Sequence, residues 1–233
     1  MFSRIISFDT IENSSIWSAQ YFSKSQEKTP LSSFPTVCIR DVAEERKETV
    51  NPQDTPYAEY TYIGLENIES STRTLFLPTI KKGVDIKSTS KIFRLGDVLY
   101  GRLRPNLNKV YLVDDRFPVG LCTTEIIVLV LKKDILSEYF AEILLSEEVK
   151  QKAESLTRGA SLPRVQVEDF MRIRIPLPDM SVQREIVEFI QTHRKQWNHY
   201  RTLVNEVPQF IQNSLYSKLY EDKHLFPMPA LSH

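Results

Sequence analysis

The sequence has few cysteines and few glycines, and neither sign of charge is in excess. Of its 233 residues two are cysteines and six are glycines, and 30 basic residues balance 30 acidic ones. Cys38 and Cys122 are too few for a disulfide framework and lack the spacing of a metal site, which favours a reducing compartment. The zero net charge excludes a basic field over the whole chain, so binding of nucleic acid would require a local basic patch.

Long apolar runs are also missing. The longest run, IIVLVL at Ile126–Leu131, is far shorter than the roughly 20 residues that cross a membrane. The hydrophobic fraction of 41% is nevertheless sufficient for a core. We therefore expect a soluble cytoplasmic protein with no membrane partner, either one large domain or one domain with an appendage.

The sequence contains no set of residues that would suit an enzyme active site. No FxGxG cofactor loop occurs among the six glycines, and Asn51-Pro52-Gln53-Asp54 lacks the second proline and the aromatic of an amino-methyltransferase motif. Glu45-Arg46-Lys47 matches half of a nuclease motif but has no suitably spaced acid, so a solvated face is expected there. A methyltransferase or nuclease is thus disfavoured, and neither a cofactor nor a metal is expected.

The stretch GDVLYGRLRPNLNKV, Gly96 to Val110, is the most informative part of the chain. It begins as an apolar strand, and alternation in an extended chain would send Arg102 and Arg104 to one face. Two guanidinium groups, followed by Asn106, Asn108 and Lys109, suit phosphates and the edges of DNA bases. The alternative is a solvated strand end with ordinary surface arginines.

Charge is segregated along the chain. Between Lys87 and Arg116, seven basic residues face three acids, whereas Asp134 to Glu154 carries six acids and two lysines. The loop Arg158–Arg164 is a second basic segment. A charge-neutral chain that binds DNA needs a local excess of this kind.

The pattern of strands and helices predicts an α+β (mixed α/β) domain over residues 1–178, with a twisted, mainly antiparallel sheet and covering helices. Continuous apolar runs such as Ile126–Leu131 predict strands buried on both faces. The periodicity of Leu136 to Leu156 predicts a covering helix with an acidic exposed face, and an alternating strand is expected at Met171–Ile175. Pro176 and Pro178 then predict a stiff hinge.

From Ser181, a predicted N-cap, the pattern becomes helical and forms the second unit, residues 179–233. A helix to Asp222 would be about 60 Å long, with a kink at Pro208. Apolar residues at heptad a and d spacing predict a coiled-coil seam, which requires another helix in this chain or in a partner. His193 lies on the seam, where we expect a packing role. The other seam residues are Ile186, Ile190, Trp197, Tyr200, Val204, Val207 and Ile211.

Five ordered blocks together resemble one target-recognition domain and the helix that follows it in the specificity (S) subunit of type I restriction–modification systems. The resemblance covers Phe34 to Asp222. The usual subunit has two such domains and two helices, whereas this chain has one of each. The alternatives are therefore a single-domain half-subunit, a truncated form or a component of a related phage-defence system. The blocks are YTYIGLENIE, DIKSTSKIFRLGDVLYGRLRPNLNKV, GLCTTEIIVL, TRGASLPRV and IPLPDMSVQREIVEFI.

The resemblance implies a non-catalytic DNA-recognition subunit that reads one half of a bipartite site. It also implies partners: double-stranded DNA, the methyltransferase (modification) subunits and possibly a restriction subunit. We expect the helix seam to form an antiparallel homodimer; a pure protein–protein adaptor is the competing hypothesis. The expected DNA-binding residues are Arg102, Arg104, Asn106, Asn108, Lys109, Lys87, Ser90, Lys91, Arg158, Ser161 and Arg164.

Overall fold

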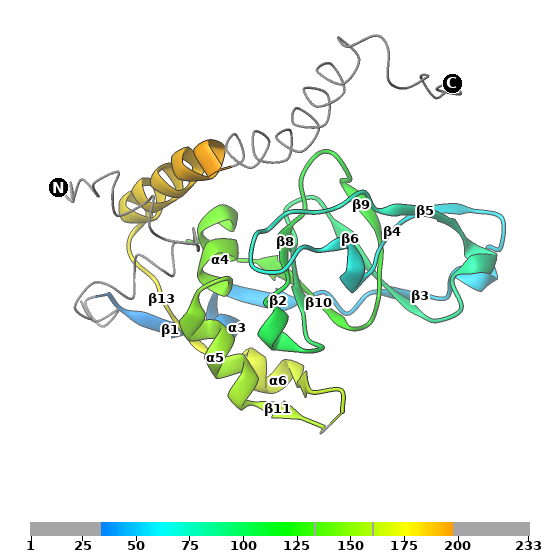
Figure 1. The fold of residues 1–233 in the computed structure, drawn as a ribbon, viewed down its shortest axis with the longest axis horizontal. Coiled ribbons are helices and arrows are strands. Elements are labelled where there is room, and N and C mark those ends of the chain that lie inside the picture. Colours follow the sequence, from blue (N-terminus) through cyan, green and yellow to red (C-terminus); the bar gives the residue numbers. More distant parts are fainter. Residues whose placement is uncertain (1–33, 133, 160, 198–233) are drawn as a thin grey trace, which may run out of the picture. The chain divides into compact units, whose positions relative to one another are not determined.

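The computed structural model describes residues 34–132, 134–159 and 161–197 (Figure 1). The chain divides into two compact units, Met1–Arg184 and Glu185–His233. This division falls inside the C-terminal helix, whereas the predicted boundary lies just before that helix.

Two mainly antiparallel sheets form the body of the first unit, and within its described residues the pairing of β4 with β9 is the one parallel pairing. The five-stranded sheet has the order β3 (Thr49–Val50), β6 (Ser90–Arg94), β9 (Val119–Cys122), β4 (Glu59–Ile63) and β5 (Thr79–Lys82). The four-stranded sheet has the order β2 (Ala43–Glu45), β10 (Ile126–Leu131), β7 (Val98–Gly101) and β8 (Val110–Leu112).

Shorter elements complete this unit, and the predicted α+β class is confirmed. Two small sheets pair β1 (Thr36–Cys38) with β13 (Arg174–Pro176) and β11 (Thr157–Arg158) with β12 (Arg164–Val165). The α-helices are α3 (Ile39–Val42), α4 (Ser137–Leu144), α5 (Glu147–Ser155) and α6 (Val167–Phe170). The 3-10 helices of the described residues are η2 (Pro52–Asp54), η3 (Leu65–Asn67), η4 (Gly83–Asp85) and η5 (Pro105–Leu107).

The two larger sheets share one hydrophobic core. Phe93 and Ile63 of the five-stranded sheet pack in the same buried cluster as Leu99, Tyr111 and Val128 of the four-stranded sheet. The predicted burial of the IIVLVL run is confirmed for its first four residues, which are fully buried. A shared core makes the two sheets one folding unit.

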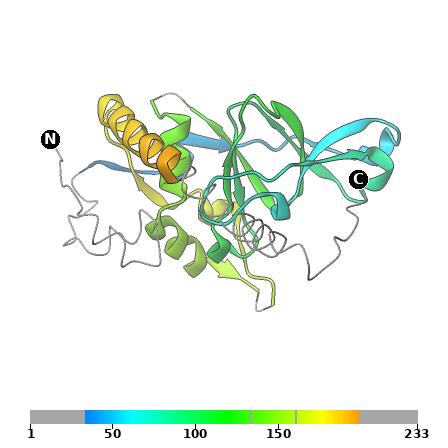
Figure 2. The same cartoon turned by 45° about the horizontal axis from the view of Figure 1, so that its top comes forward.

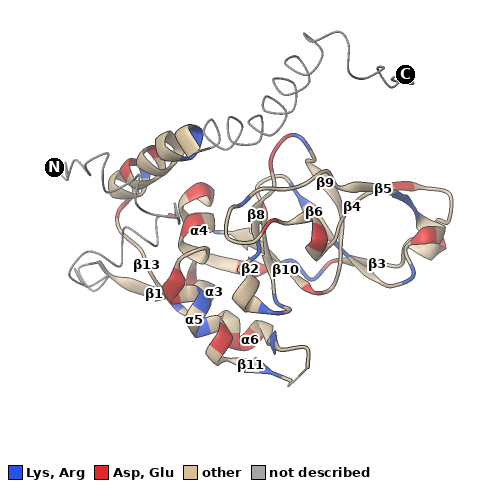
Figure 3. Cartoon of the chain, viewed as in Figure 1, with Lys and Arg blue, Asp and Glu red and all other residues tan. Residues whose placement is uncertain are grey.

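Two predicted elements differ from the structure. The expected helix over 136–156 is two helices, α4 and α5, because the Oγ of Ser146 accepts a hydrogen bond from Val149 N and starts a new helix. The exposed face of α5 is not purely acidic, because Lys150 pairs with Glu147 and Lys152 with Glu148, and the helix carries both red and blue residues in Figure 3. The expected strand at 171–175 is also wrong for its first residues, since α6 and a turn precede β13.

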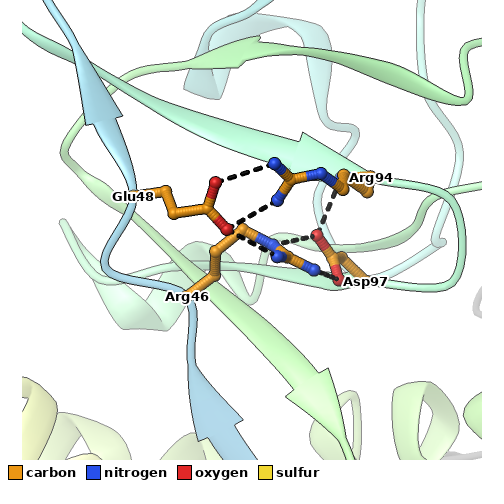
Figure 4. A network of polar contacts seen from close by, with 4 residues as sticks. All are labelled: Arg46, Glu48, Arg94 and Asp97. Atoms are coloured by element: carbon orange, nitrogen blue, oxygen red, sulfur yellow. Dashed lines mark hydrogen bonds and ion pairs between the residues drawn. The ribbon is translucent and has the colours of Figure 1, made fainter.

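The expected solvated face at Glu45–Lys47 is wrong for Arg46, whose side chain is only 16% exposed. Arg46 donates two hydrogen bonds of 2.9 Å to the carboxylate of Asp97 and one of 3.0 Å to Glu48 (Figure 4). Arg94 closes the network with two bonds of 2.7 Å to Glu48. These bonds join the chain between β2 and β3 to the end of β6 and to the turn before β7, so the network links the two sheets.

The hydrogen bonds and charges of this network shift the pKa values of Glu48 and Arg46. Hydrogen bonds from Arg94 and then from Arg46 lower the pKa of Glu48 to about 2. The hydrogen bond to Asp97 raises the pKa of Arg46 above its ordinary value. Both shifts favour the charged forms that the network requires.

The C-terminal helix begins at residue 180, and Asp179 caps it in place of Ser181. Asp179 Oδ1 accepts hydrogen bonds from Ser181 N, Ser181 Oγ and Val182 N, which lower the pKa of this carboxyl. Gln183 is fully buried; it accepts from Leu136 N at 2.9 Å and donates to Pro178 O at 2.9 Å and Asp134 O at 3.2 Å. The first helical turn is therefore bonded to the rest of the first unit.

The described part of the second unit is the helix up to residue 197. Phe189 is 63% exposed and packs on the His193 ring of the same helix at a centroid distance of 4.1 Å. The expected packing of His193 against another helix stays a prediction. Ile186 and Ile190 are half-buried and Trp197 is exposed. Tyr200, Val204, Val207 and Ile211 of the predicted seam lie outside the described residues.

Candidate nucleic-acid interface

Three segments meet at the end of β7: the 102–108 turn, the 123–125 turn and the β11–β12 hairpin. Arg102 N donates to Glu125 O at 2.9 Å, and Val165 N donates to Arg102 O at 3.1 Å. Leu103 forms a bridge with Arg164. We call this group of segments the three-segment site; its hairpin projects from the body of the first unit in both views (Figures 1 and 2).

The 102–108 turn follows β7 because the backbone leaves the extended conformation there. Strand β7 ends at Gly101, and Arg104 adopts a left-handed conformation with φ of 51°. Pro105 then starts η5, and Asn108 is left-handed with φ of 45°. The prediction that strand alternation places Arg102 and Arg104 on one face is therefore wrong.

The tip of this turn carries two exposed polar side chains, those of Arg104 and Asn106. Among the described residues, neither side chain has a hydrogen-bond or ion-pair partner. The backbone beneath them is fixed, because Arg104 N donates to Pro163 O at 2.8 Å. These two groups are therefore presented to solvent on an ordered loop.

Asn108 and Lys109 face inward, which differs from their expected place on a DNA-binding surface. Asn108 is fully buried and its amide donates to Leu145 O at 2.8 Å. Lys109 Nζ donates to Leu65 O at 2.6 Å and to Ile68 O at 2.7 Å, and desolvation lowers its pKa. Both side chains connect the turn to neighbouring segments and are not available to a ligand.

Much of the predicted basic excess between Lys87 and Arg116 is neutralised by partners. Lys91 is buried against Glu45 at 2.8 Å, and Arg116 pairs with Asp114 at 2.7 Å. Ser90 is fully buried, while Lys87 is exposed and donates to Val84 O at 2.7 Å. The basic residues counted along the sequence therefore do not form one basic patch on the surface.

The hairpin keeps its two arginines at the surface, each with an acidic partner. Arg158 is exposed and pairs with Asp169 at 2.9 Å. Arg164 is held by Glu125 through bonds of 2.7 to 2.9 Å, which raise its pKa. Ser161 is exposed beside them.

Arg102 lies beneath the exposed tip. Its Nη2 donates to Gln166 Oε1 at 3.0 Å, and its Nε is buried without a hydrogen-bond partner. No sequence signal points to Gln166, Glu125 or Asp169, because nothing in their local sequence marks them as partners of arginines elsewhere in the chain.

The described residues include no cluster of three or more histidine, cysteine or acidic side chains able to hold a metal ion. No helix in the described ranges has the length and apolar character needed to cross a membrane.

Comparison with known proteins agrees with the resemblance seen in the sequence. The family model "Type I restriction modification DNA specificity domain" matches residues 32–209. A search of curated proteins gave no match. The fold is similar to that of the HsdS subunit from Thermoanaerobacter tengcongensis, with 24% identity, a TM-score of 0.66, and coverage of 91% of this chain and 54% of the other.

Two further structures share the fold. One comes from a study of complex assembly and conformational transition of a type I R-M system (23% identity, TM-score 0.65, 86% and 51% coverage). The other is the S subunit of a type I restriction-modification system from M. genitalium (13% identity, TM-score 0.54, 81% and 46% coverage). The chain thus spans about half the length of the solved relatives that it matches. Because the family model covers most of the sequence, the chain belongs to the type I restriction modification DNA specificity domain family.

Proposed function

We propose that this chain recognises a specific DNA sequence, one half of a bipartite site, and does no chemistry itself. The observation that carries the proposal is the three-segment site, in which exposed polar side chains stand on backbone fixed by hydrogen bonds, in a member of a DNA specificity family. Hydrogen-bonding groups held in place before binding lose less conformational entropy when they meet a ligand.

The proposed DNA surface consists of Arg104, Asn106, Arg158, Ser161 and Arg164, with Lys87 as a more distant contact. Arg104 has no carboxylate partner among the described residues, so its full charge is available to a phosphate. The Asn106 amide carries a donor and an acceptor, the pair that recognises adenine in the major groove.

We further propose that the C-terminal helix binds another helix, in a second copy of this chain or in a methyltransferase subunit. The exposed rings of Phe189 and Trp197 support this, because large apolar side chains gathered on one exposed helix are typical of protein interfaces. Light scattering of the purified chain with and without Trp197→Glu would distinguish a homodimer from a monomer that awaits its partner.

The test of DNA recognition is fluorescence anisotropy with duplexes selected from a random library, measured over a range of salt concentrations. Binding through phosphates should weaken steeply as salt rises. Arg104→Ala should weaken binding to all sequences and lower the salt slope by about 1.

The matched control is Arg116→Ala, which removes an exposed arginine at the opposite end of β8 from the 102–108 turn. It should leave affinity unchanged. Failure to enrich any sequence, with salt-insensitive or absent binding, would favour the adaptor hypothesis. Incubation of the purified chain with duplex DNA, S-adenosylmethionine and magnesium should give neither methylation nor cleavage.

A further inference from the structure

We propose that Arg164 reads a guanine in the DNA site and that Glu125 is the residue that positions it. This inference rests on the proposed function, since it assigns one base contact within the same three-segment site. Nothing in the sequence distinguishes Arg164 from the other candidate arginines. In the structure, its hydrogen bonds to Glu125 and Leu162 distinguish it.

Glu125 occupies one side of the Arg164 guanidinium. Arg164 Nε lies 2.9 Å from both carboxylate oxygens of Glu125, and Nη2 lies 2.7 Å from Oε1. Nη1 donates to Leu162 O at 3.1 Å. Because a guanidinium has five N–H groups, one N–H on each terminal nitrogen remains for a ligand.

We assign the Leu162 bond to the Nη1 hydrogen on the Cδ side, so the two outward N–H groups remain as a parallel pair, which matches the O6 and N7 acceptors of guanine. It is also accessible, because the Arg164 side chain is 34% exposed and that of Glu125 is 26% exposed. Leu103, which bridges to Arg164, precedes the exposed Arg104 directly. A duplex that contacts Arg104 therefore lies within reach of Arg164.

Charge favours a base over a phosphate as the ligand of Arg164. The carboxylate of Glu125 neutralises the arginine and would repel a phosphate nearby, whereas a base edge is neutral. Arg104 has no such carboxylate among the described residues, so the two arginines should divide into a base contact and a phosphate contact.

The position of Glu125 is itself fixed by its backbone. Glu125 O accepts from Arg102 N at 2.9 Å, and Glu125 N donates to Thr123 Oγ1 at 3.3 Å. The turn between β9 and β10 thus holds the carboxylate, and the carboxylate holds the arginine. An arginine held in one orientation discriminates between bases better than a mobile one.

The experiment begins with the full chain and a random duplex library, which yields the preferred sequence. Each guanine of that sequence is then replaced in turn by 7-deazaguanine, which lacks the N7 acceptor, or by another base. At one guanine the wild type should lose about 5- to 150-fold in affinity on base replacement. Arg164→Lys, which keeps the charge but loses the parallel donors, should abolish the preference at that position, measured as the ratio of the affinities for the original and the replaced duplex.

Glu125→Gln supplies a readout that a purely structural role would not change. Removal of one negative charge should strengthen binding to random duplex, while selectivity for that one guanine falls. Arg104→Ala is the matched control and should weaken all duplexes without altering any single-base preference. Circular dichroism should show that each variant is folded.

The possible failures are distinguishable. If no sequence is enriched, the proposed function itself fails. If a sequence is enriched but contains no guanine, or if Arg164→Lys and Glu125→Gln respond to every guanine replacement as the wild type does, the chain still recognises DNA and the assignment of Arg164 is overturned.

Discussion

Two arginine–carboxylate pairs in this chain have nearly the same geometry and very different surroundings. Arg46 presents Nε and Nη2 to Asp97 at 2.9 Å, and Arg164 presents Nε and Nη2 to Glu125 at 2.7 to 2.9 Å. Asp97 is 3% exposed within a network between two sheets, whereas Glu125 lies at the surface beside an exposed turn.

Burial decides what each pair contributes. A buried carboxylate that loses its partner, or a buried arginine that loses its carboxylate, retains an uncompensated charge in a medium of low dielectric. At the surface water replaces the lost partner, so the pair adds little to stability and its geometry is available for binding. Similar bonds can therefore stabilise the fold in one region and, as we propose, orient a DNA contact in another.

The largest effect should come from breaking the interior pair. Asp97→Ala leaves Arg46 largely buried with Glu48 as its one remaining carboxylate partner among the described residues, and it removes the acceptor of Arg94 N. We expect a loss of about 3–5 kcal/mol in the free energy of unfolding, measured by urea denaturation. Asp115→Ala, an exposed aspartate of the β8–β9 turn, is the control and should change stability by less than about 0.5 kcal/mol. Equal effects of the two variants would mean that the network is not what joins the sheets.

Asn108→Ala should have the next largest effect, although it replaces a neutral group. It leaves Leu145 O without its donor, which costs about 1–3 kcal/mol, and it forces alanine into a left-handed conformation, which adds about 1–2 kcal/mol. Asn108→Gly separates these contributions because glycine tolerates a φ of 45°. If the glycine variant were as destabilised as the alanine variant, the backbone contribution would be absent.

The pH dependence of the unfolding free energy should show what the charge of Glu48, at the exposed edge of the interior network, contributes. Glu48 has a pKa of about 2 in the folded chain against an ordinary value of 4.5, so its stabilising contribution is fully present above about pH 4.5. That contribution is lost as the pH falls from 4.5 toward 2, because the carboxylate must be protonated. The difference in unfolding free energy between wild type and Glu48→Gln should therefore shrink over this range. A difference that stayed constant from pH 6 to pH 2.5 would contradict the assigned role of the charge.

The smallest effect on stability should come from the surface pair. Glu125→Ala removes a carboxylate that, like Asp97, is bonded to the Nε and Nη2 of one arginine, yet it should lower the unfolding free energy by no more than about 1 kcal/mol. Thermal denaturation of this variant beside Asp97→Ala makes the comparison direct. A loss as large as that of Asp97→Ala would show that the surface pair is also structural.

The sequence was sufficient to predict the elements whose signal is local. The apolar run at Ile126–Leu131 predicted a buried strand, and the order of five sequence blocks predicted the family. These predictions succeeded because strand burial and motif order are readable without knowledge of the contacts between distant residues.

The candidate site could be predicted only in part, because pairing over long separations decides which charges remain at the surface. Lys91 pairs with Glu45 and Arg164 with Glu125, and neither carboxylate lies near its partner in the sequence. The left-handed backbone of Arg104, which ended the expected strand alternation, was equally invisible because arginine carries no signal for that conformation.

The burial of Gln183 determines where this chain could be joined to another in a chimeric protein. A junction between Pro178 and Asp179 would leave Leu136 N and Asp134 O without their partners whenever the incoming helix lacked a glutamine at the matching position. Each lost partner costs about 1–3 kcal/mol. A junction after Gln183 keeps these bonds, so exchange of recognition specificity between relatives is best made one helical turn into the helix.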